Sequence, residues 1–283
     1  MRSYVQRQTR SLLRIFAARL TRAALSGDAE AIHDLRVSIR RLSRGLRTFA
    51  PHYPDRSWKS YRSQLRCLMQ LAGAVRDRDI ALEALSRAGI PARSPIVRCL
   101  HTERRAANNE FLAEVRRWKQ QGIPRQWSRQ LAIPLPPNSP ATANTHARRT
   151  LPRLAADYFS EVRRLLARQP RVRELHQARL ATKRFRYTLE LFRPCYGTGL
   201  ETRIAELRRV QHLLGEVNDS VASRDLLSAA MALSPLRDRI RGFLKERAAN
   251  DAAAFRQEWE ERFDSPGREA WWKTYLKKIR RPA

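Results

Sequence analysis

Residues 32–53 read IHDLRVSIRRLSRGLRTFAPHY and combine an apolar helical face with a basic one. Leu35, Ile39, Leu42 and Leu46 recur at alternating four- and three-residue steps, the pattern of a helix that packs on a core through one face. The opposite side carries a row of basic side chains: His33, Arg36, Arg40, Arg44 and Arg47. The stretch holds five arginines and one acidic residue, although like charges at these spacings destabilise a helix. A solvated face would normally intersperse glutamates, so the pattern predicts a helix that faces an anion.

A similar stretch, LHQARLATKRFRYTLELFRPCY, occupies residues 175–196 and aligns His33 with His176. Its basic side holds His176, Arg179, Lys183 and Arg186, but Tyr187 replaces Arg44 and Glu190 replaces Arg47. Two further matches follow in the same order. GAVRD at 73–77 aligns with GEVND at 215–219, and RAANN at 105–109 aligns with RAAND at 247–251. This order of matches indicates an internal duplication.

Helical periodicity persists through both halves, and no alternating run is long enough for a sheet. Breaks at Gly, Pro and Ser clusters leave four helical stretches in each half, which predicts an all-α fold of two four-helix bundles. The predicted parts are a first repeat over 1–121, a second over 146–263 and a short C-terminal helix over 264–283. Residues 122–145 hold five of the fifteen prolines and are expected to form an extended linker.

The formal net charge is +30, and the sequence pI is about 11.5. Self-repulsion on this scale favours a polyanionic partner: nucleic acid, polyphosphate, an acidic membrane surface or an acidic protein. No window approaches 18 uncharged apolar residues, so no membrane span is expected. The three cysteines form no CxxC pair, which predicts a reducing, cytoplasmic setting without a disulfide framework or structural zinc.

The two histidine stretches, with LAGAVRDRDIAL and LLGEVNDSVAS after them, resemble the CHAD family of histidine-containing helical domains. The resemblance covers essentially the whole chain. It implies two bundles related by pseudo-twofold symmetry, with a basic cavity between them that binds inorganic polyphosphate, and association with polyphosphate granules. The ligand residues that it implies are His33, Arg36, Arg40, Arg41, His176, Arg179, Lys183, Arg184 and Arg186.

Two kinds of residue stand outside that pattern. Arg44 and Arg47 join the predicted site through the helical-face argument alone, while Ser43 stands where the family usually has a basic residue. The repeat-matched Arg105 and Arg247 either add to the basic cavity or pair with acidic residues. Both alternatives fit the sequence.

The motifs favour binding without catalysis. An enzyme acting on polyphosphate would need metal-binding carboxylates, and the nearest string, EWEER at 258–262, reads as a surface helix. There is no P-loop, so no metal or cofactor is predicted. Nucleic-acid binding is the alternative function, with a polyphosphate-processing enzyme as the third. Nucleic-acid binders interleave aromatic residues for stacking, whereas the basic stripes include only Tyr187. Weak, non-specific nucleic-acid binding is therefore expected, and the oligomeric state is left open.

Overall fold

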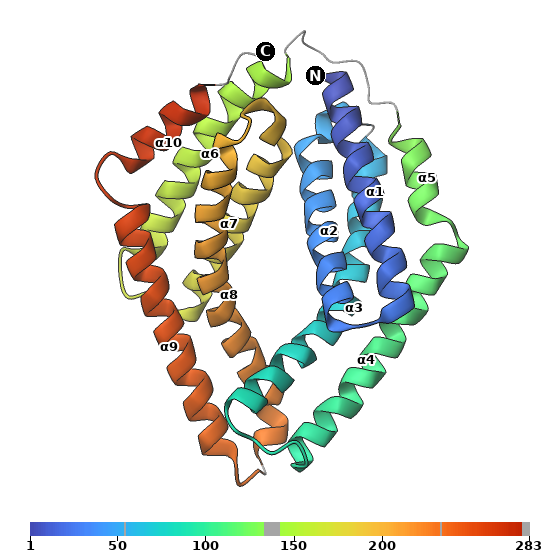
Figure 1. The fold of residues 1–283 in the computed structure, drawn as a ribbon, viewed down its shortest axis with the longest axis vertical. Coiled ribbons are helices and arrows are strands. Elements are labelled where there is room, and N and C mark those ends of the chain that lie inside the picture. The colour runs from blue at the N-terminus through green and yellow to red at the C-terminus, as the bar shows by residue number, and fades with distance from the viewer. Residues whose placement is uncertain (54, 133–141, 233, 279–283) are drawn as a thin grey trace. The chain divides into compact units, whose positions relative to one another are not determined.

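A computed structural model describes residues 1–53, 55–132, 142–232 and 234–278 of the chain (Figure 1). Every regular element within these ranges is a helix, which confirms the predicted all-α class. In chain order the elements are α1 Arg2–Ser26, α2 Ala29–Thr48, the short 3-10 helix η1 Ala50–His52, α3 Asp55–Arg87, α4 Pro95–Gln120, α5 Ile123–Gln130, α6 Ala143–Leu166, α7 Val172–Leu191, the 3-10 helix η2 Arg193–Cys195, α8 Gly199–Ala232, α9 Arg237–Arg262 and α10 Arg268–Lys277. None of the helices in the described part is both long enough and apolar enough to cross a bilayer.

The chain divides into two compact units, which we call the N-terminal unit and the C-terminal unit. The N-terminal unit comprises Arg2–Asn138 and Ser223–Ile240, and the C-terminal unit comprises Ser139–Ala222 and Arg241–Ala283. The later segment belongs to the N-terminal unit because, for example, Nε of Arg239 donates a hydrogen bond to the carbonyl of Ala88 at 3.0 Å. The repeat boundaries proposed from the sequence differ from this division, and the duplication itself stays a prediction.

Helices α1 to α4 form a four-helix bundle in the N-terminal unit, with α1 against α2 and α4, and α3 between α2 and α4 along the ring (Figure 1). Phe16 of α1 lies at the centre of its aromatic contacts and is fully buried. Its ring is 5.8 Å from that of Trp118 in α4 and 6.2 Å from that of Trp127 in α5. Buried aromatic rings remove large apolar areas from water, so this cluster contributes strongly to the packing of the bundle.

Helix α5 corrects the prediction of an extended linker over 122–145. Residues 123–130 are helical because Ile123 and Trp127, four residues apart, are both buried against the bundle. Pro124 lies in the first turn of α5, where the missing N–H costs nothing. Helix α6 also begins within the predicted linker, where Thr142 caps it. The proline-rich part of that prediction, residues 133–141, lies outside the described residues.

The C-terminal unit is built around aromatic side chains from α6, α7, α9 and the segment that follows it. Tyr158 of α6 contacts Phe185 of α7, with ring centroids 4.8 Å apart, and Trp259 of α9 at 5.7 Å. The predicted C-terminal helix is present as α10, and its Trp272 is fully buried 5.5 Å from the ring of Phe185. Helix α10 is therefore part of the core of this unit.

Candidate anion-binding site

Helix α2 turns its charged side away from the bundle core. Oδ1 of Asp28 accepts a hydrogen bond from the backbone N–H of Ala31 at 2.6 Å, which caps the helix and lowers the pKa of that carboxyl group. Leu35 and Leu42 on the opposite side are fully buried. His33 and Arg47 are exposed, and the arginines between them are partly exposed. The orientation of α2 predicted from its apolar spacing is thus the one in the structure.

Helix α3 adds basic side chains next to those of α2. At one end, Arg76 lies close enough to His33 that its charge, after burial, is the main cause lowering the pKa of that imidazole. At the other end, burial and the charges of Arg47 and Arg66 lower the pKa of the Arg62 guanidinium. We call this surface the α2–α3 basic face; it consists of His33, Arg36, Arg40, Arg44, Arg47, Arg62, Arg66 and Arg76. From His33 to Arg47 it extends along roughly 21 Å of α2, at about 1.5 Å per residue.

Gly73 lets Arg36 cross over α3. A Cβ atom placed on Gly73 would lie 2.9 Å from Nη1 of Arg36, closer than side-chain atoms normally approach. Any larger residue at this position would push the guanidinium aside. The glycine in GAVRD therefore has a packing role within the basic face.

Three arginines of this face were missed from the sequence: Arg62, Arg66 and Arg76. At about 100° per residue they fall on one side of α3, together with Gly73. That spacing is visible in the sequence, but α3 has 33 residues and its many arginines point in several directions. Which side of α3 turns towards α2 is decided only by packing. Arg41, about 80° from His33 around α2, lies at the edge of the face and is partly exposed.

The corresponding side chains of α7 in the C-terminal unit are held by polar partners. Nδ1 of His176 lies 2.7 Å from Oδ1 of Asn218, and Nη2 of Arg179 lies 4.0 Å from Oδ1 of Asp219. Arg184 forms an ion pair with Glu161 of α6. Lys183, like Arg186, is buried.

Arg186 has the most enclosed position of these. Its guanidinium forms an ion pair with Glu190, donates to Gln211 of α8 at 2.9 Å and lies 4.2 Å from the ring centroid of Tyr187. This side chain is thus held by protein groups on three sides, and its predicted contact with a ligand stays a prediction. The C-terminal unit thus brings together the predicted residues of α7, but with acidic and amide groups among them.

The repeat-matched pair in α4 and α9 behaves unequally. Arg247 forms an ion pair with Glu216 and lies 3.8 Å from Asp251, so its charge is balanced by acidic residues. Arg105 is exposed and donates to the hydroxyl of Thr102 at 3.2 Å. The alternative of pairing with acids therefore holds for Arg247.

Asp79, two residues after the GAVRD motif, has a structural contact. Oδ1 of Asp79 accepts a hydrogen bond from Nε of Arg104 at 2.9 Å, which ties α3 to α4. Arg104 also reaches the carbonyl of Gly27 at the turn before α2. This contact supports the start of α2, and hence the position of His33.

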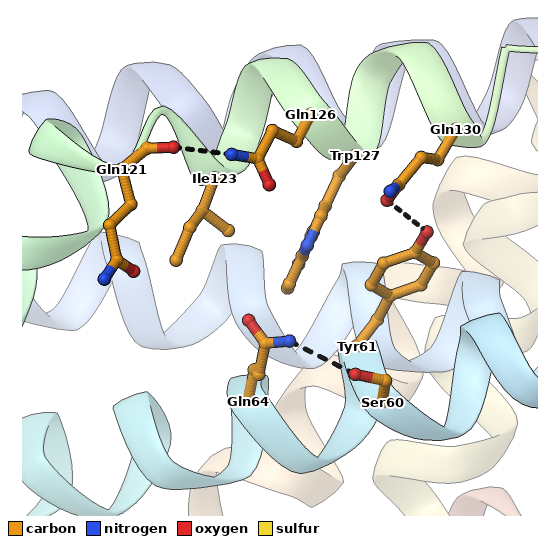
Figure 2. Close-up of a pocket in the computed structure, with 8 residues that line it drawn as sticks. All are labelled: Ser60, Tyr61, Gln64, Gln121, Ile123, Gln126, Trp127 and Gln130. Carbon is orange, nitrogen blue, oxygen red and sulfur yellow. Dashed lines mark hydrogen bonds between the residues drawn. The ribbon is translucent and has the colours of Figure 1, made fainter.

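A pocket of about 770 Å³ lies elsewhere in the N-terminal unit (Figure 2). Uncharged side chains line it, contributed by α3, α5 and the residues that end α4: Ser60, Tyr61, Gln64, Gln121, Ile123, Gln126, Trp127 and Gln130. Tyr61 donates to Oε1 of Gln130 at 2.6 Å across it. By helical spacing Ser60 and Gln64 lie roughly opposite Arg62 and Arg66 around α3, so the pocket is separate from the α2–α3 basic face.

Lowering the pH from about 7 to about 5 should strengthen anion binding through His33. Burial and the charges of Arg76, Arg40 and Arg36 lower its pKa, while Asp34 opposes them, so the imidazole is neutral at neutral pH and becomes cationic on acidification. Protonation also costs stability, which is present above the ordinary pKa and is lost as the pH falls through the lowered one. Binding of tripolyphosphate, measured against pH by calorimetry, should rise less in His33→Gln than in the wild type. Identical pH profiles would contradict a ligand-facing His33.

Comparison with known proteins identifies the family. The model of the CHAD domain matches residues 7–228. The chain is similar in structure to the CHAD domain from the plant Ricinus communis, with 19% identity, a TM-score of 0.66, and coverage of 98% of this chain and 93% of that one. It is also similar to PptA from Streptomyces chartreusis, with 18% identity, a TM-score of 0.70, and coverage of 91% and 98%. No curated protein matches the sequence. The two structures support the fold, and the family match over residues 7–228 shows that this chain belongs to the CHAD domain family.

Proposed function

We propose that this protein binds inorganic polyphosphate along its basic helical faces without acting on it chemically. The CHAD family is linked to polyphosphate binding in general. The observation that carries the proposal for this chain is the α2–α3 basic face, where seven arginines and His33 lie on two adjacent helices. Arginine binds phosphate oxygens with two parallel hydrogen bonds, so a row of them suits a ligand that repeats phosphates along a line.

The surroundings of the face favour a phosphate chain over nucleic acid. Proteins that bind single-stranded nucleic acid stack bases on exposed aromatic rings. Tyr187, which shares the α7 stripe, is buried, and Arg186 lies over its ring. Trp271 of α10 is 40% exposed, and the guanidinium carbons of Arg203 and Arg268 each lie 4.7 Å from its ring centroid. Arginine guanidinium groups lie against both of these rings, which supports phosphate contacts as the basis of recognition.

A competition experiment at fixed salt tests the proposal. Labelled long-chain polyphosphate should bind the full chain, and unlabelled polyphosphate should displace it at a far lower phosphate concentration than duplex DNA or single-stranded RNA. The reason is that nucleic acid offers phosphates at wider spacing and bulky bases that the arginine row does not contact. Fluorescence anisotropy measures both displacements. Equal displacement by nucleic acid at equal phosphate concentration would favour the nucleic-acid alternative.

Polyphosphate binding also bears on where the protein is located. A protein that binds long polyphosphate chains would be concentrated where such chains accumulate, so we place it in the cytoplasm at polyphosphate granules. The shared cavity and the symmetry that the family resemblance implies stay predictions.

A further inference from the structure

We propose that the two basic faces contribute unequally, and that the α2–α3 basic face of the N-terminal unit supplies most of the affinity for polyphosphate. The α7 side chains of the C-terminal unit serve mainly to stabilise that unit through their own ion pairs. This inference rests on the proposed function and specifies which arginines carry it. It includes Arg62, Arg66 and Arg76 of α3, which the family motif does not mark.

Four arginines of the α2–α3 basic face, two on each helix, lack local counter-charges among the described residues. The side chains of Arg40, Arg47, Arg66 and Arg76 form no hydrogen bond or ion pair with any residue in the described part of the chain. An acidic neighbour on α2 is already engaged, since Asp34 lies 2.8 Å from Arg19 and 3.2 Å from Arg22 of α1.

Like charges therefore accumulate along two adjacent helices. Among the side chains that the structure describes, the same side of α3 by helical spacing also holds the exposed Asp77, and the seven arginines of the face outnumber it. Repulsion among these arginines is relieved when a polyanion binds, which adds to the gain from each phosphate contact.

The α7 side of the C-terminal unit is already neutralised by its own acids. Glu161 pairs with Arg184, while Glu190 pairs with Arg186 and lies 3.9 Å from Arg208. A phosphate that binds here must displace or compete with a carboxylate, so each contact releases less free energy than at an unpaired arginine. The net charge of these ion-paired groups is also small, which reduces electrostatic attraction of the ligand.

The sequence differences between the matched stretches follow the same division. Aligning GAVRD with GEVND places Asn218 opposite Arg76. Instead of a cation beside the histidine, the C-terminal unit has an amide that contacts Nδ1 of His176 at 2.7 Å. The same register places the fully buried Ile204 opposite Arg62. Arg44 and Arg47 are likewise matched by Tyr187 and Glu190. Four basic positions of the N-terminal unit are therefore neutral or acidic in the C-terminal unit: Tyr187, Glu190, Ile204 and Asn218.

Matched double variants of the full chain test the inference, each removing two positive charges. Arg40→Gln/Arg76→Gln and Arg47→Gln/Arg66→Gln neutralise the two ends of the α2–α3 basic face, and Arg179→Gln/Arg184→Gln neutralises the α7 side. Affinity for long-chain polyphosphate is measured by anisotropy over a salt series. Each N-terminal variant should lose about tenfold or more in affinity. Its plot of log affinity against log salt concentration should become shallower, by about 1.4 to 1.8 in slope. The α7 variant should lose less than about threefold, with a slope close to that of the wild type.

The controls distinguish a failure of the unequal division from a failure of the proposed function. Thermal unfolding followed by circular dichroism checks that each variant is folded. Because there are two independent N-terminal variants, the test can still be made if one of them does not fold. Comparable losses in the α7 and N-terminal variants overturn the unequal division while leaving polyphosphate binding intact. A wild-type chain that does not bind polyphosphate overturns the proposed function as well.

Discussion

Raising the NaCl concentration from about 50 mM to about 200 mM should weaken long-chain polyphosphate binding by about a thousandfold. Each arginine–phosphate contact releases condensed counterions, and the logarithm of the affinity falls with the logarithm of the salt concentration by about 0.7 per contact for a single-stranded polyanion. The α2–α3 basic face offers seven arginines, and a fourfold rise in salt across seven such contacts gives about three orders of magnitude. Anisotropy or calorimetry at constant pH measures the slope directly.

Two controls exclude other causes of that loss. Circular dichroism over the same salt range should show an intact helical signal, because screening relieves the self-repulsion of a chain with a net charge of +30. A neutral osmolyte at the same osmolality should leave the affinity unchanged. A loss smaller than about tenfold would mean that few phosphates are contacted, and it would contradict binding along the face.

Replacing Phe16 by alanine should lower the free energy of unfolding by about 3 to 5 kcal/mol. The side chain is fully buried, and its ring contacts Trp118 of α4 and Trp127 of α5, so its removal leaves a cavity where three helices meet. Domains are typically stable by only about 5 to 15 kcal/mol, so the variant would lose a large share of its stability. Urea unfolding followed by circular dichroism and tryptophan fluorescence measures the change.

The neighbouring residue supplies a matched control. Ile15 lies next to Phe16 on α1 but is 38% exposed, so Ile15→Ala should change the stability by less than about 1 kcal/mol. The helix propensity of alanine is high, which further limits any loss. If the two substitutions cost the same, the aromatic contacts among α1, α4 and α5 would not be the source of stability in this unit.

Much of the fold and part of the candidate site could be predicted from residue spacing. The orientation of α2 followed from Leu35 and Leu42 against Arg40 and Arg47, because a helix with one apolar face can bury only that face. The short C-terminal helix was also predicted, although not that Trp272 would enter the core. Helix α5 was missed, since a proline-rich composition outweighed the two buried residues, Ile123 and Trp127, that make it pack.

Whether the cations of a candidate site are paired with other protein groups depends on residues that are distant in sequence. Arg184 pairs with Glu161 in the preceding helix, and Arg186 donates to Gln211 in the following one. Helical spacing within α7 contains no information about either neighbour. The same holds for Arg76, whose position beside His33 results from the packing of α3 on α2.

The sequence by itself determined that this chain is helical, that α2 and α7 each carry a basic side, and that it resembles a polyphosphate-binding family. Local periodicity suffices for these points, because which face of a helix is apolar depends only on residues three and four positions apart. The tertiary structure alone decided which arginines lie together without acidic partners and which are already paired. Electrostatic interactions act through space between helices, and the neighbours of a charge are set by packing rather than by its position in the chain.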